Sequence, residues 1–410
     1  MNETGRTTSL NSAVRAQTFA REEHIVPLDG LRGLAVLMVM FGHFWLAQKP
    51  VNALETWTYT FVQNGWVGVD LFFVLSGFLI TGILLEAKGS SHYFRNFYAR
   101  RVLRIFPLYW GFLLVYFVIL PRIVSLDPAS PFLTAPGMKP WFWAYASNML
   151  ALVPGAVIPP GLNHFWSLAV EEQFYLIWPA IVFAVSAKTL ERTCVGLVVF
   201  AFAFRLFLLT TPYHHTGGYV LTPARIDTLA IGAWLAVIYR DPARRERVEA
   251  VAPRAFLVAL AALAIANLPD LRMFGYRVSM QTVGFPLLAV MAASLISIGT
   301  GKAVKNAGLR KLFGRRVLVG AGKYSYAMYV FHLPLVIALE MAGLHMKTLS
   351  GGNPPGILAA LAYSILLSIA TFLVAFASWH LYEKHFLKLK HFFPRREHYL
   401  PAHDRNAEKR

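Results

Sequence analysis

Arg32 and His43 are two ionisable side chains in one apolar segment, and their spacing gives them a common face. In an α-helix, eleven residues turn through about 1100°, which is about 20° past three full turns. The two side chains then lie about 16 Å apart along the helix axis. An imidazole can exchange a proton near neutral pH, so the pair marks a candidate site of chemistry. The structural alternatives stay open: Arg32 reaching lipid phosphates, and His43 bonding a neighbouring helix.

Three arginines form a second constellation, Arg100-Arg101-x-x-Arg104. Because Arg101 and Arg104 are three residues apart, they can share one helical face. Planar guanidinium groups suit phosphate oxygens, so the pattern predicts an anion-binding site that also includes Arg32. Ordinary cytoplasmic-side charge is the alternative explanation.

Two adjacent carboxylates, Glu171 and Glu172, follow Trp166 and Ser167 in an aromatic, apolar segment. Neighbouring helical residues point about 100° apart, so the two carboxylates cannot face one partner. We expect one of them to face a cavity while the other caps or pairs. The alternative is that both simply reach the outer interface.

Three further candidates carry charge or an imidazole at helix positions where structure and chemistry are both plausible: Asp70, Asp227 and His332. Together with Trp166 and Ser167, they are the predicted substrate-binding residues. The two carboxylates stand at the outer starts of their segments, where a helix-dipole or capping role competes with acceptor binding. His332 lies in mid-segment, where it either lines the same cavity as His43 or makes a packing hydrogen bond.

The composition places these residues in a membrane protein. The chain has 410 residues and a net charge of +18, yet only 15% of residues are charged and 56% are hydrophobic. This excludes a disordered polyelectrolyte and argues against a soluble globular domain. Anionic lipid explains the basic charge, so nucleic acid is not a predicted partner. A single cysteine, Cys194, excludes a cysteine-based metal cage, and no metal is predicted.

Runs of bilayer-spanning length predict an all-α, polytopic bundle of about ten transmembrane helices. The predicted spans are Leu28–Ala47, Trp66–Leu85, Leu103–Leu120, Phe165–Val185, Val195–Leu209, Ala224–Tyr239, Ala255–Leu268, Met280–Ile298, Gly322–Ala342 and Gly356–Leu381. A further apolar stretch, Pro140–Pro154, is predicted not to cross the membrane.

Lys and Arg clusters fix the predicted orientation. If both termini are cytoplasmic, the basic clusters fall on the inside and the alternate loops are poor in Lys and Arg. This predicts a multi-pass protein of the inner (cytoplasmic) membrane. The predicted units are a cytoplasmic tail at 1–24, a transmembrane domain at 25–385 and a basic cytoplasmic tail at 386–410.

Five sequence blocks keep their order along nearly the whole chain. They are Pro27–Val36 leading to His43, Gly68–Ile80, Phe97–Tyr109, Trp166–Pro179 and Tyr324–Pro334. Together they resemble the acyltransferase-3 family of membrane-bound O-acyltransferases. The resemblance covers roughly residues 25 to 385, and that family is itself known for about ten transmembrane helices.

The resemblance implies transfer of an acyl group, usually acetyl, from cytoplasmic acyl-CoA to a hydroxyl of a glycan or glycolipid, such as lipopolysaccharide or exopolysaccharide. It also implies that Arg32 and His43 are the hallmark pair and that Arg101 and Arg104 serve the CoA donor. We expect His43 to act as a general base, with Glu171 or Glu172 orienting its imidazole or binding the acceptor. A covalent acyl-histidine intermediate is the alternative route.

A competing interpretation is a transporter or flippase of a glycan or lipid-linked intermediate, because charges inside the membrane also mark permeation pathways. No inverted repeat that would favour it is evident in the sequence. The predicted partners are acyl-CoA, the acceptor and membrane lipid. The sequence sets no oligomeric state, acyl chain length or acceptor identity.

Overall fold

The computed structural model describes residues 26–45, 50–123, 136–267, 277–301, 307–344 and 356–394, and within these ranges it is helical and contains no strand. The first helices are α2 (Val26–Phe44), α3 (Ala53–Gln63), α4 (Gly68–Ala87), α5 (Tyr93–Leu114) and α6 (Leu120–Ile123). The middle helices are α7 (Lys139–Trp143), α8 (Phe165–Ala184), α9 (Ala187–Leu208), α10 (His214–Val220), α11 (Thr222–Ile238) and α12 (Pro242–Ala266). The last are α13 (Phe285–Thr300), α14 (Ala307–Phe313), α15 (Arg316–Met341), α17 (Ile357–Ser378) and α18 (Lys384–Lys388).

Short 3₁₀-helical and π-helical turns join these elements. Three π-helical turns, η2 (Val115–Ile119), η6 (Met280–Gly284) and η7 (Trp379–Glu383), interrupt or extend long helices. The 3₁₀ turns are η1 (Asn64–Val67), η3 (Pro136–Met138), η4 (Ser147–Leu152), η5 (Pro160–Leu162) and η8 (Leu389–Phe392). Pro140–Pro154 holds only α7 and η4, so it contains no helix long enough to cross a bilayer.

A helix occupies each of the ten predicted spans, but among the described residues seven segments are both long and apolar enough to cross a membrane. They are Val26–Phe44, Ala53–Ala87, Tyr93–Arg122, His214–Ile238, Pro242–Ala266, Met280–Thr300 and Ile357–Phe392. Helices α8, α9 and α15, with 20, 22 and 26 residues, have the length but are not among the seven. The predicted tail 1–24 lies outside the described residues, as do Ala47, Leu268 and the chain beyond 394.

Two helices begin well before the predicted spans because polar side chains cap them. Helix α9 starts at Ala187, where the Ser186 hydroxyl accepts a hydrogen bond from the Thr189 amide. In the same way, the Asp241 carboxylate accepts from two amides at the start of α12. Such caps satisfy amides that have no partner inside the helix, and a hydropathy count does not detect them.

The outside of the bundle is apolar, and its interior, which is also mostly apolar, encloses several charged side chains that a soluble protein would keep at its surface. Leu257 and Val258 on α12 are 62% and 68% exposed, and Leu358 on α17 is 81% exposed. By contrast, the side chains of Arg205 and Asp227 are completely buried. An exterior of this kind is suited to hydrocarbon, and the chain is a multi-pass membrane protein.

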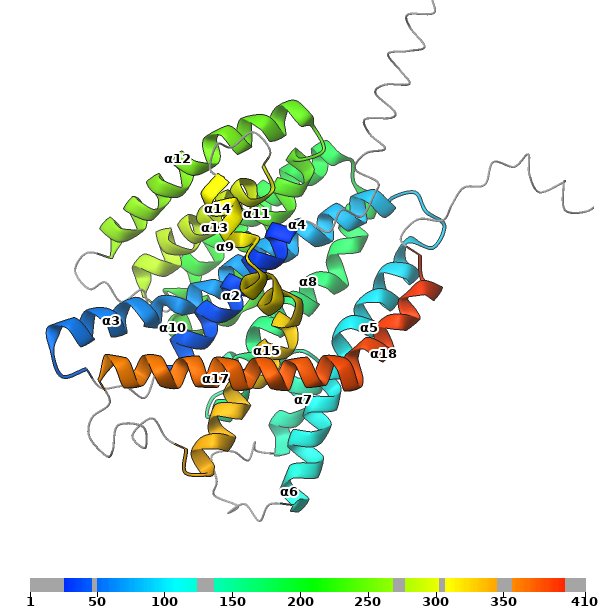
Figure 1. Ribbon diagram of the computed structural model, residues 1–410. Coiled ribbons are helices and arrows are strands. Elements are labelled where there is room, and N and C mark those ends of the chain that lie inside the picture. Colours follow the sequence, from blue (N-terminus) through cyan, green and yellow to red (C-terminus); the bar gives the residue numbers. More distant parts are fainter. Residues whose placement is uncertain are drawn as a thin grey trace, which may run out of the picture.

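Helix α2 lies at the centre of the bundle, in contact with α4, α13, α15 and α17 (Figure 1). Its backbone touches that of α15 directly. A Cβ atom at Gly33 would lie 1.9 Å from the Leu318 carbonyl oxygen, and one at Gly322 would lie 1.8 Å from that of Asp29. Only glycine allows helices to approach so closely, and this crossing sets the relative position of the side chains that α2 and α15 carry.

Candidate functional site

Three histidines from distant parts of the chain meet in the core: His43 on α2, His332 on α15 and His164, which immediately precedes α8. The Nδ1 atom of His43 lies 2.9 Å from Nε2 of His332, and the two rings are stacked with centroids 5.0 Å apart. The His164 ring meets the His332 ring edge-on, with centroids 4.6 Å apart. We call these three residues the histidine cluster.

The histidine cluster is held by hydrogen bonds to the backbone. Nδ1 of His332 lies 2.7 Å from the carbonyl oxygen of Tyr329, one turn earlier on α15. The hydroxyls of Ser167 and Tyr329 are 2.5 Å apart, and they lie 3.1 and 3.2 Å from the His164 carbonyl oxygen. His332 is fully buried, whereas His43 keeps partial exposure, so His43 is the more accessible imidazole of the two.

His164 is buried among aromatic rings at the end of the segment that precedes α8. It is 3% exposed, and its two ring nitrogens have no hydrogen-bond partner among the described residues. Burial in these surroundings disfavours the charged imidazolium form of His164. The imidazole is therefore neutral at physiological pH.

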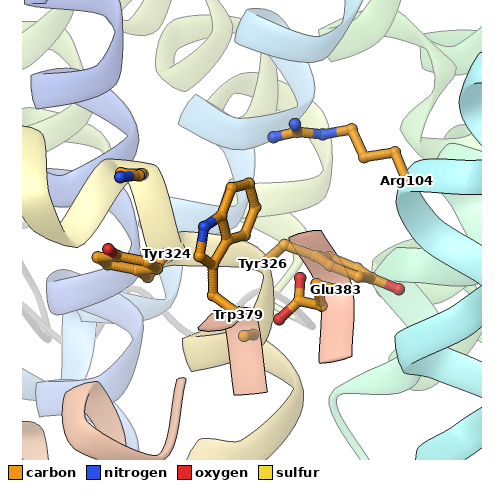
Figure 2. A pocket seen from close by; sticks show the side chains of 7 residues that line it. Arg104, Tyr324, Tyr326, Trp379 and Glu383 are labelled. Carbon is orange, nitrogen blue, oxygen red and sulfur yellow. The ribbon is translucent and has the colours of Figure 1, made fainter. Parts of the chain in front are cut away.

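Arginines gather at the other end of α2. Arg32, Arg101 and Arg104 lie close enough for their charges to interact. Arg101 stands over the Tyr175 ring, 5.4 Å from its centroid. Figure 2 shows Arg104 extending toward the Trp379 indole in a small pocket. That pocket is lined by Arg104, Lys323, Tyr324, Tyr326, Ala327, Trp379 and Glu383.

Arg100 differs from its neighbours because its guanidinium contacts the C-terminal segment. Nη1 donates to the carbonyl oxygens of Lys390 and Phe393, at 3.2 and 2.8 Å. These contacts give Arg100 a structural role in fixing that segment against α5. Its assignment to donor binding stays a prediction.

The carboxylates Glu171 and Glu172 lie toward the arginines. Glu171 is within hydrogen-bonding reach of Ser76 and Tyr175 and within electrostatic range of Arg32 and Arg101. Glu172 interacts with Glu171 and Arg101. The hydrogen-bond partner of His43 is His332 and not one of these glutamates. The contribution of Glu171 and Glu172 to catalysis stays a prediction.

Asp70 and Asp227 form buried ion pairs that hold α4, α9 and α11 together. The Asp70 carboxylate lies 2.5 Å from Arg225, and that of Asp227 lies 2.8 Å from Arg205. The Arg225 guanidinium stacks on the Phe285 ring at 3.8 Å and stands 5.9 Å from the ring centre of Trp166. These contacts explain both carboxylates structurally, and acceptor binding by Asp70, Trp166 or Asp227 stays a prediction.

Substitution of Asp227 by Asn should destabilise the protein by about 3–5 kcal/mol, because it leaves the Arg205 charge buried without its counter-charge. Thermal unfolding in detergent measures the effect. Glu191→Gln is the matched control, since the Glu191–Arg244 pair is partly exposed and should contribute about 1 kcal/mol or less. Equal melting temperatures for D227N and E191Q would contradict the structural role of the Asp227 pair.

His164 and Tyr329 are not among the residues predicted from the sequence. His164 stands seven residues before Glu171 and two residues before the block Trp166–Pro179, so its position was a usable signal. Nothing in local periodicity connects it to His332. Within the described ranges, no group of three or more His, Cys, Asp or Glu side chains is placed to hold a metal ion.

Comparison with known proteins gives a consistent result. The model of a family described as an acyltransferase domain matches residues 25–379. The chain is 28% identical over 385 residues to the "Putative peptidoglycan O-acetyltransferase YrhL" of Bacillus subtilis, covering 88% of this chain and 54% of that protein. It is 27% identical over 341 residues to the "Peptidoglycan O-acetyltransferase OatA" of Listeria monocytogenes, covering 78% and 51%. The chain thus spans about half the length of these relatives. No solved structure matches it significantly.

Proposed function

Because the chain belongs to the acyltransferase domain family, we propose that it transfers an acyl group, acetyl in the simplest case, from acyl-CoA to a hydroxyl of a glycan. The observation that carries this proposal is the layout of α2. One end of this helix presents His43, paired with His332, and the other presents Arg32 beside Arg101 and Arg104. A base and a phosphate-binding cluster are the two groups that acyl transfer from CoA requires.

The chemical step follows from the accessible imidazole. His43 takes the proton of the acceptor hydroxyl, and the hydroxyl oxygen attacks the thioester carbonyl. The C–S bond breaks as the C–O bond forms, and His43 returns the proton to the departing CoA thiolate. An acyl-histidine intermediate would use the same imidazole as a nucleophile.

The donor is expected at the arginine end of α2. The pocket beside Arg104 adds a second cation, Lys323, and an indole, Trp379, which together suit a phosphorylated ring system. With α8, α9 and α15 crossing besides the seven apolar segments, the chain has ten spans. An even number of spans puts both termini on one side of the membrane, and the Lys and Arg clusters favour the cytoplasm as that side. In this proposal the arginine end of α2 faces the cytoplasm and the protein lies in the inner membrane.

The acceptor is a polysaccharide or a glycolipid outside the cytoplasm. The relatives' names favour a peptidoglycan hydroxyl, while lipopolysaccharide and exopolysaccharide present the same chemical group. Because the relatives are about twice as long as the matched region, the acceptor of this chain is proposed by class only.

Turnover by purified protein tests the proposal. Detergent-solubilised protein is given acetyl-labelled acetyl-CoA and either a muropeptide or an oligosaccharide from lipopolysaccharide, and acetyl esters are detected by mass spectrometry. We expect free CoA and an acetylated acceptor in the absence of any gradient. Failure of both acceptors to gain acetyl, together with gradient-dependent glycan movement in vesicles, would favour the transporter alternative.

Substitution of Arg101 and Arg104 together by Gln should weaken donor binding. Each charge-assisted hydrogen bond to phosphate contributes about 1.5–3 kcal/mol, so the KM for acetyl-CoA should rise at least about tenfold. Arg95→Gln is the control on the same helix, because the Arg95 side chain bonds its neighbour Asn96. An unchanged dissociation constant for acetyl-CoA in the double variant would refute the donor assignment.

A further inference from the structure

We propose that His332 is a positioning residue that fixes the tautomer of His43, so that Nε2 of His43 is the atom that accepts the proton. The inference rests on the proposed function, since it names the reacting atom of the proposed base. It also changes the predicted role of His332, from substrate binding to control of His43.

The direction of each hydrogen bond shows which ring nitrogens of His332 and His43 carry a proton. The Tyr329 carbonyl oxygen can only accept, so Nδ1 of His332 must carry a proton and donate to it. In a neutral imidazole the other nitrogen is then unprotonated, and Nε2 of His332 is an acceptor. The 2.9 Å contact therefore requires a proton on Nδ1 of His43. Nε2 of His43 is left with its lone pair.

This assignment of protons requires that His332 is neutral, and the surroundings of His332 favour that state. His332 is fully buried, and its ring neighbours are His43, Phe44, His164 and Tyr329. None of these side chains is a carboxylate that would compensate a buried imidazolium. The pair therefore resembles the orienting half of a catalytic triad, with a backbone-anchored imidazole in place of the aspartate.

The fold explains how the pair is kept in register. His43 lies ten residues after Gly33 on α2, and His332 lies ten residues after Gly322 on α15. Both glycines are at points where the two backbones touch. The separation of the imidazoles is therefore set by rigid helices and not by loops.

Two substitutions of His332 separate positioning from simple packing. His332→Leu removes the acceptor, whereas His332→Gln can place its Oε1 atom where Nε2 of the histidine stood. We expect H332L to lower kcat about 100-fold, with the KM for acetyl-CoA changed less than about twofold. The kcat of H332Q should be at least about tenfold higher than that of H332L. The control is His214→Leu, because His214 makes the same bond to a carbonyl three residues earlier but lies outside the cluster.

Equal kcat values for H332L and H332Q, or a wild-type kcat in H332L, would overturn the proposal.

A measurement on the unsubstituted protein keeps it testable if these variants fail to fold. Long-range ¹H–¹⁵N spectra of ¹⁵N-histidine-labelled protein report which ring nitrogens carry protons, with the His43 signals assigned from H43A and the His332 signals from their coupling across the hydrogen bond to His43. We expect both histidines as neutral Nδ1–H tautomers. An Nε2–H tautomer at His43, or a doubly protonated His332 at pH 7.5, would overturn the inference whether or not acetyl transfer is found. Absence of transfer with the expected spectrum would instead count against the proposed function.

Discussion

Replacement of His43 by Ala is expected to lower kcat for acetyl transfer by about 10²- to 10⁴-fold, the usual contribution of a positioned general base. Donor affinity should change little, because Arg32 lies eleven residues away on α2, about 16 Å along its axis. Initial rates of CoA release and acceptor acetylation in detergent, with varied acetyl-CoA, separate the two parameters. The cavity left by the substitution is small compared with the contacts that hold α2, so the protein should still fold.

The control for this experiment is His385→Ala, on α18 and outside the histidine cluster. Its kcat should match that of the unsubstituted protein. Unchanged transfer by H43A would defeat both the general-base mechanism and the acyl-histidine alternative. To distinguish those two, the protein is incubated with acetyl-CoA alone and its mass measured: an acetyl group on His43 supports the covalent route, and its absence supports direct attack.

Replacement of Gly322 by Ala should disrupt the bundle at its centre. The added Cβ would lie 1.8 Å from the Asp29 carbonyl oxygen, and that atom belongs to a helix backbone that cannot rotate away. Overpacking of flexible cores costs about 1–3 kcal/mol, so a backbone clash should cost about 3 kcal/mol or more. We expect a lower melting temperature, reduced yield and lost transfer, because α2 and α15 together position His43 and His332.

Gly320→Ala is an unusually close control, since it is the same substitution two residues earlier on α15. A Cβ atom there meets nothing within 4 Å, and alanine favours a helix over glycine by up to about 1 kcal/mol. G320A should therefore melt at the same temperature as the parent or above it. If G322A were as stable as G320A, the close approach of the two helices would be wrong.

The sequence determined the elements of this protein and the local geometry within each of them. Apolar runs predicted a helix in each of ten ranges, and the eleven-residue spacing predicted that Arg32 and His43 share one face of α2. Five ordered blocks predicted the family. The helices and the family are confirmed, because hydropathy and motif order are properties of residues that are close along the chain. The shared face of Arg32 and His43 stays a prediction from the helical period.

Only the tertiary structure decided which of these residues meet. His43 and His332 are 289 residues apart, and their contact depends on glycines that let α2 touch α15. Other contacts likewise join segments that are distant in the sequence. They are the ion pairs of Asp70 and Asp227, the hydrogen bonds of Arg100 to the C-terminal segment, and the ring contact of His164 with His332. Helical periodicity gives the face of each side chain but not the neighbouring helix that this face meets. That choice depends on backbone approach and on the pairing of buried polar groups across the whole bundle.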